Sequence, residues 1–179
     1  MSVSADGRYL AYGHIAVSAK TGWDVWILPL FGDRKPFAYL RREFSEFFPA
    51  FSPDGRFLAY TSDEAGGQQV YVVSFPEPRG RWQVSASGGS QPRWSRDGRE
   101  LLFASGDNTL MSAEIRIRGL SLEVGAIRPL FPLGVVSQLG NVYDLAPNSK
   151  RIVVLGPIER DSGEPLTLVI NWTADLPRK

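Results

Sequence analysis

One short phrase recurs four times along the chain, and this repetition constrains the fold more than any other feature. Three copies join a serine, an Asp-Gly pair and a basic residue to an apolar stretch, and a fourth copy is altered. The copies centre on Asp6, Asp54, Asp97 and Asn148, at intervals of 48, 43 and 51 residues. A period of about 40–50 residues that is built from strands is typical of radial repeat architectures, in which each repeat packs against its neighbours.

Each Asp-Gly pair predicts the tip of a β-hairpin. Aspartate accepts hydrogen bonds from nearby backbone N–H groups, and glycine adopts a positive φ without steric cost. Because the pairs hold the same place in every repeat, a structural role is favoured over a catalytic one. The residues assigned to these turns are Asp6, Gly7, Asp54, Gly55, Asp97 and Gly98. Asn148-Ser149 departs from the pattern and leaves the fourth turn open.

One full period contains four strand-like segments, which are separated by Gly- and Pro-rich breaks. In the second period they span 47–51, 57–61, 69–75 and 82–85. Four antiparallel strands form the blade of a β-propeller. We therefore predict an all-β propeller with about four blades and no helix, as one domain over 1–179. The predicted blades are approximately 1–41, 42–87, 88–133 and 134–174. A partial ring is favoured, and closure of four blades on themselves is the alternative.

Composition narrows the classes of function. The net charge is +1 and the basic residues are scattered, which argues against binding to nucleic acid. The chain has no cysteine, so disulfides and thiol nucleophiles are excluded. No apolar run approaches the ~18 residues of a membrane span, so we expect no direct membrane insertion by this segment.

No catalytic, metal or cofactor site emerges from the sequence. His14 is the single histidine, and no nucleophile elbow or regularly spaced ligand set accompanies it. We therefore expect a chain that is not an enzyme and holds no cofactor. The aromatic residues Phe51, Trp26 and Trp94 are predicted to pack in the core. Trp23 and Trp82 begin strands and are predicted to lie nearer the surface, where an aromatic side chain can anchor a ligand.

The first strand of each blade lines the axis of a propeller, and the loops before these strands form one face. That face is the predicted binding surface for a protein, a peptide or a small ligand. Hydrogen bonding between blades is the alternative role for each candidate residue. The candidates are Glu46, Phe48, Gln91, Arg93, Asn141, Tyr143 and Asp144.

The repeated Ser-x-Asp-Gly-Arg-x-Leu phrase resembles the WD40-like repeats of the Pro-Asp-Gly type, which occur in TolB and in many bacterial sensor and peptidase propellers. A narrower resemblance links residues 69–76, 88–98 and 168–174 to the C-terminal propeller of certain bacterial serine/threonine protein kinases. In such proteins a cytoplasmic kinase precedes a membrane span and an extracytoplasmic propeller. No kinase motif is present in this chain.

The resemblance implies a non-catalytic binding or scaffold module, the extracytoplasmic sensory part of such a kinase. The alternatives are a TolB-like propeller of a periplasmic envelope complex and the gating propeller of a prolyl-oligopeptidase-like peptidase. A periplasmic or extracytoplasmic location follows from the resemblance alone, and the residues leave the location open. Open blade edges also predict self-association.

Overall fold

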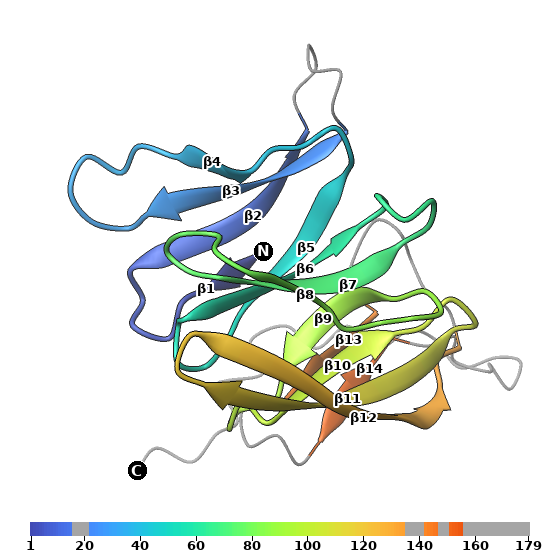
Figure 1. Cartoon of the computed structure of the whole chain (residues 1–179). Coiled ribbons are helices and arrows are strands. Elements are labelled where there is room, and N and C mark those ends of the chain that lie inside the picture. The colour runs from blue at the N-terminus through green and yellow to red at the C-terminus, as the bar shows by residue number, and fades with distance from the viewer. Residues whose placement is uncertain (16–21, 135–141, 147–150, 156–179) are drawn as a thin grey trace, which may run out of the picture.

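The computed structural model describes residues 1–15, 22–134, 142–146 and 151–155. These residues form four antiparallel sheets and no helix, which confirms the all-β prediction. Figure 1 shows the sheets following one another like a fan, from blue through green to orange. Within each sheet the strands lie in the order of the sequence, as expected for propeller blades.

Three sheets have four strands each, and we number them blades 1 to 3. Blade 1 contains β1 (Ser2–Val3), β2 (Tyr9–Ile15), β3 (Trp23–Pro29) and β4 (Phe37–Leu40). Blade 2 contains β5 (Glu46–Phe51), β6 (Phe57–Ser62), β7 (Gln69–Ser74) and β8 (Arg81–Gln83). Blade 3 contains β9 (Ser90–Trp94), β10 (Glu100–Ala104), β11 (Thr109–Arg118) and β12 (Ser121–Pro132). The beginning of blade 4 is the pair β13 (Tyr143–Leu145) and β14 (Ile152–Val154).

The turn between β5 and β6 shows how the repeated phrase folds. The Ser52 hydroxyl donates to Asp54 Oδ1 at 2.6 Å, and the backbone N–H of Arg56 donates to the same oxygen at 3.1 Å. The Ser52 hydroxyl oxygen also accepts the backbone N–H of Phe57 at 2.9 Å. Gly55 adopts a φ of 69°, in the region that favours glycine. The serine is therefore as central to the turn as the Asp-Gly pair.

The turns of blades 1 and 3 repeat this network. The serine hydroxyl lies 2.6 Å from the carboxylate of Asp6 and 2.7 Å from that of Asp97. These hydroxyl bonds, followed by the backbone N–H bonds, lower the pKa of Asp6 and of Asp97. Burial opposes the same effect at Asp54, but the hydrogen bonds still lower its pKa. The fourth turn, Asn148-Ser149, lies outside the described residues.

The core lies between blades, and strand alternation distributes it. Phe57 and Leu58 are adjacent in β6, but they belong to different clusters because successive side chains point to opposite faces. The cluster between blades 1 and 2 includes Ala11, Val25, Ile27, Leu58, Tyr60 and Val73. The cluster between blades 2 and 3 includes Phe57, Ala59, Val72, Trp94, Leu101 and Phe103. A third cluster joins blade 3 to the start of blade 4 through Leu102, Ala104, Leu110, Val142 and Tyr143.

The aromatic residues divide much as predicted. Phe51 and Trp94 are buried in the core. Trp23 is 41% exposed, and Trp82 is half-buried with its ring packed edge-on against Phe57. Trp26 is only half-buried, because it lies on the face of blade 1 that points away from blade 2. No described blade covers that face. Self-association through open blade edges stays a prediction.

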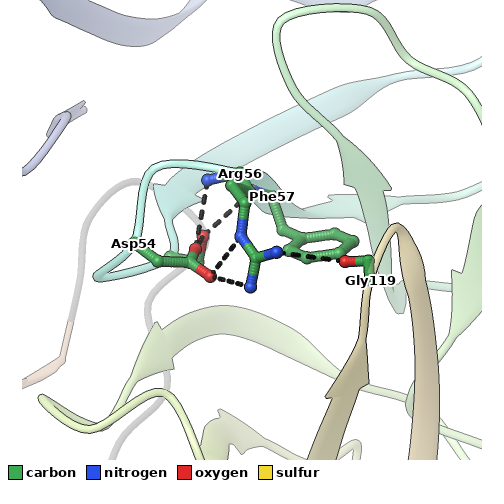
Figure 2. Close-up of polar contacts among 5 residues, drawn as sticks. Asp54, Arg56, Phe57 and Gly119 are labelled. Atoms are coloured by element: carbon green, nitrogen blue, oxygen red, sulfur yellow. Dashed lines mark hydrogen bonds and ion pairs between the residues drawn. The ribbon is translucent and has the colours of Figure 1, made fainter.

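A long hairpin of β11 and β12 extends blade 3 toward blade 2. The side chain of Arg56 pairs with Asp54 at 2.8 Å and donates to the carbonyl of Gly119 at 3.1 Å (Figure 2). The hairpin tip is thereby tied to the Asp-Gly turn of the neighbouring blade. This extension was not predicted, although the alternation between apolar and charged residues in 114–118 is typical of a strand.

Candidate ligand-binding site

A cleft of about 490 Å³ opens between blades 1 and 2, and its volume lies within the range of small-molecule sites. We call it the aromatic cleft. It is lined by Met1, Tyr12, Gly13, Trp23, Ser45, Phe47, Phe48, Pro49, Asp63 and Gln68. Four of these residues are aromatic, and none has a lysine, arginine or histidine side chain.

A glycine allows two aromatic side chains to converge at the wall of the cleft. Gly13 lies in the middle of β2, and a Cβ placed there would lie 3.3 Å from the Trp23 ring and 4.0 Å from Phe47 Cβ. Trp23 opens β3 opposite Ile15 and keeps part of its ring exposed. The absence of a side chain at position 13 thus lets the indole lie against the strand.

A bulge in β5 presents the rings of Phe47 and Phe48 to the cleft. The register of β5 on β6 shifts between Phe47 and Ala50, and Phe48 adopts a φ of 54°. The rings of Phe47 and Phe48 meet edge to face with 5.1 Å between their centroids. Gln91 holds the same place in blade 3, with a φ of 58°. The bulge therefore belongs to the repeat, whereas the aromatic pair belongs to blade 2.

The polar side of the cleft is formed by Asp63. Its Oδ1 accepts the backbone N–H of Ser45 at 2.9 Å, which joins the end of β6 to the segment before β5. The carbonyl of Ser45 in turn accepts the N–H of Asp63 at 3.4 Å. The second carboxylate oxygen of Asp63 has no hydrogen-bond partner among the described residues.

Glu46 lies directly behind the cleft, between its lining residues Ser45 and Phe47. Its side chain is buried, and both carboxylate oxygens lack a hydrogen-bond partner within the described part of the chain. Burial raises the pKa of Glu46, Arg42 opposes this change, and the carboxylates of Asp24 and Asp63 add a smaller increase, so that the pKa lies at about 7. The hydroxyl of Tyr60 in the same interface is also buried without a partner.

Two of the predicted binding residues are enclosed in inter-blade hydrogen bonds. Gln91 Oε1 accepts the backbone N–H of Val142 at 2.9 Å, and the Tyr143 hydroxyl donates to the Gln91 carbonyl at 2.6 Å. Gln91 N–H also donates to Thr61 Oγ1 at 3.2 Å. These hydrogen bonds join blades 2, 3 and 4. Gln91 and Tyr143 thus form hydrogen bonds between blades, the role that was the alternative to ligand binding.

Two other predicted residues meet near the axis. Arg93 and Asp144 hold equivalent places in β9 and β13, and their charged groups lie 3.5 Å apart. The arginine is mostly buried and the aspartate is largely exposed. Asn141 lies outside the described residues. Among the candidates that the structure describes, Phe48 alone lines the aromatic cleft, and a binding role for the others stays a prediction.

Trp23 was predicted to lie near the surface, where it can anchor a ligand, and Phe48 was a candidate binding residue of the propeller face, whereas Gly13, Phe47 and Asp63 were not predicted to bind. A signal for the pair in β5 was present, because Phe47-Phe48 stands where blade 3 has Ser90-Gln91. The role of Gly13 and Asp63 depends on contacts between segments distant in sequence.

The described residues bring together no group of three side chains that could hold a metal ion. The ring of His14 lies 5.1 Å from that of Trp26, and its buried Nδ1 has no hydrogen-bond partner within those residues. No carboxylate therefore orients the imidazole through Nδ1 there. The same part of the chain contains no helix long and apolar enough to cross a membrane.

Comparison with solved structures identifies the fold. A protein described as TolB from Agrobacterium tumefaciens superposes with a TM-score of 0.55 and 21% identity, over 73% of this chain and 49% of that protein. TolB from Acinetobacter baumannii matches with a TM-score of 0.60 and 16% identity, over 84% of this chain and 35% of that one.

The fold is that of a TolB-like β-propeller. A protein described as a 6-phosphogluconolactonase from Bacteroides uniformis shares it, with a TM-score of 0.56 and 18% identity over 86% of this chain and 46% of that one. The chain thus spans half or less of the length of each of these propellers. No protein-family model and no curated protein sequence matches the chain.

Proposed function

We propose that this TolB-like chain is a non-catalytic binding module that takes a peptide or a small ligand in its aromatic cleft. The observation that supports this proposal is the cleft of about 490 Å³. It is lined by Trp23, Phe47 and Phe48 and by the carboxylate of Asp63. Ligand sites typically combine apolar walls with a few placed polar groups. Aromatic side chains also dominate the energetics of recognition surfaces.

The resemblance of the repeats to the propellers of bacterial serine/threonine kinases supports a role as the extracytoplasmic sensory part of such a kinase. A sensor needs a binding site on a rigid scaffold, and the cleft lies between two packed blades that supply this rigidity. In this role the ligand occupies the cleft, and any catalytic step belongs to another part of the parent protein.

A role in an envelope complex is the second candidate. It is supported by the fold shared with two proteins described as TolB, at identities that establish the fold alone. A folded protein partner would cover the face that is formed at the first strands of the blades, including the exposed Asp144. A small ligand in the aromatic cleft would leave Asp144 free. Protection of Asp144 from a carboxylate-labelling reagent therefore separates the two roles.

The binding role is tested with a library of small molecules and short peptides, screened against the 179-residue chain by ligand-observed NMR. We expect hits that bind the wild type and are lost in Trp23→Ala. Phe37→Ala is the matched control, because Phe37 is a similarly exposed aromatic residue outside the cleft. Hits that bind both variants alike, or no hits at all, would contradict a ligand site in the cleft.

A further inference from the structure

We propose that the aromatic cleft is selective for an organic cation, namely the ammonium group of a small molecule or of a peptide side chain. This inference rests on the proposed function and names the class of ligand. It follows from the side chains that line the cleft, from the charge they carry and from the carboxylate that stands among them.

Aromatic side chains line the cleft. Trp23 begins β3 and lies against Gly13, while the bulge of β5 turns Phe47 and Phe48 toward the same space. The faces of aromatic rings carry negative electrostatic potential, and tryptophan is the most effective partner for a cation. Several rings around one space form the arrangement that binds quaternary ammonium groups.

A carboxylate, that of Asp63, also lies at the cleft. Asp63 is half-buried at the cleft, and the N–H of Ser45 fixes its orientation through Oδ1. The described residues form a hydrogen bond with Oδ1 alone, so the other oxygen is available to a ligand. A fixed carboxylate next to aromatic rings favours a positive ligand over a neutral ligand of the same shape.

The lining of the cleft contains no positively charged side chain that would compete with a cationic ligand. None of the lining residues has a basic side chain, although the chain as a whole has 20 Lys and Arg residues. Met1, which also lines the cleft, has an uncharged side chain. The buried carboxylate of Glu46 behind the cleft adds negative rather than positive potential when it is ionised.

The experiment compares choline with 3,3-dimethyl-1-butanol, its neutral isostere, by isothermal titration of the full chain at constant ionic strength. We expect choline to bind about tenfold more tightly than the isostere, since both fill the same volume but choline alone is charged. Binding of choline that is no tighter than that of the isostere, or no binding of choline, would overturn the proposal.

Variants assign the selectivity to named side chains. Asp63→Asn keeps an oxygen that can accept the Ser45 N–H, so we expect the fold to be retained. We expect this variant to lose about tenfold in choline affinity and to leave the isostere unaffected. Trp23→Ala should abolish choline binding, Trp23→Phe should restore part of it, and the control Phe37→Ala should bind as the wild type does. Unchanged choline binding in both Trp23→Ala and Asp63→Asn would overturn the proposal.

The two proposals fail in different ways. If the library screen finds neutral ligands that depend on Trp23 while choline does not bind, the cleft is a ligand site but not a cation site. If choline and library hits bind independently of Trp23, the cleft is not the ligand site at all, and both proposals fall.

Discussion

The interface between blades 1 and 2 and the interface between blades 2 and 3 are built from the same repeat but differ in their polar content. Between blades 2 and 3, Phe57 and Leu101 are fully buried, and the Trp94 indole N–H donates to the Ala50 carbonyl at 3.1 Å. Between blades 1 and 2, Glu46 and Tyr60 bury polar atoms without partners in the described structure.

The difference separates two roles of a repeat interface. A well-packed apolar interface with satisfied hydrogen bonds contributes stability. Buried polar groups without partners cost stability and occur where function requires them. The interface that carries the aromatic cleft is the one with the unsatisfied groups, so we expect stability to depend mainly on the interface between blades 2 and 3.

The largest expected effect tests that division directly. Phe57→Ala removes a fully buried ring between blades 2 and 3, and we expect a loss of about 3–5 kcal/mol in the free energy of unfolding. Tyr60→Phe removes only one buried hydroxyl, which lies near Arg81, from the other interface, and we expect a much smaller change. Urea unfolding measures both, and a larger loss in Tyr60→Phe would reverse the comparison.

The next effect concerns pH. The folded state raises the pKa of Glu46 from 4.5 to about 7, so the folded chain holds this proton more tightly than the unfolded chain. Stability should therefore fall as pH rises from about 4.5 to about 7, by at most about 3 kcal/mol. Glu46→Gln should remove this loss, so that the variant is more stable than the wild type at pH 8. Equal pH slopes for the two proteins in urea unfolding would contradict the assignment.

Alanine substitutions at two glycines are expected to have intermediate effects on stability. A Cβ at Gly89 would lie 2.6 Å from Ser85 Cβ and 3.1 Å from the Phe103 ring, in a closed part of the structure. A Cβ at Gly13 would meet the edge of the partly exposed Trp23 ring, which can move into the cleft. We expect Gly89→Ala to cost about 1–3 kcal/mol and Gly13→Ala less than about 1 kcal/mol. Thermal melting of the two variants measures the difference, and equal losses would show that the cleft is packed as tightly as the core.

A similarly small effect is expected at the turns, which both interfaces share. Asp54→Asn weakens the hydrogen bonds from Ser52 and Arg56, and we expect a loss of about 1 kcal/mol. The hydrogen bonds lower the pKa of Asp54 despite its burial, so this contribution should be lost as pH falls through the folded-state pKa. Unchanged melting of the variant near neutral pH would contradict a stabilising role for the turn.

The sequence by itself determined the repeat, the all-β class and the positions of the three hairpin turns at Asp6, Asp54 and Asp97. These features depend on residues a few positions apart, such as the Asp-Gly pairs and the alternation in 57–61. The burial of Trp94 and the exposure of Trp23 could likewise be predicted from their places in the repeat.

Tertiary structure alone decided what lies in the cleft and what lies between blades. Gln91 and Phe48 occupy equivalent bulges, yet one is enclosed by Val142 and Tyr143 and the other reaches the aromatic cleft. The reason is physical: propeller side chains meet across blades, so their neighbours lie some 40–50 residues away in sequence. The local pattern places a side chain on one face of a strand, and the packing of the next blade decides whether it is closed in or left open to a ligand.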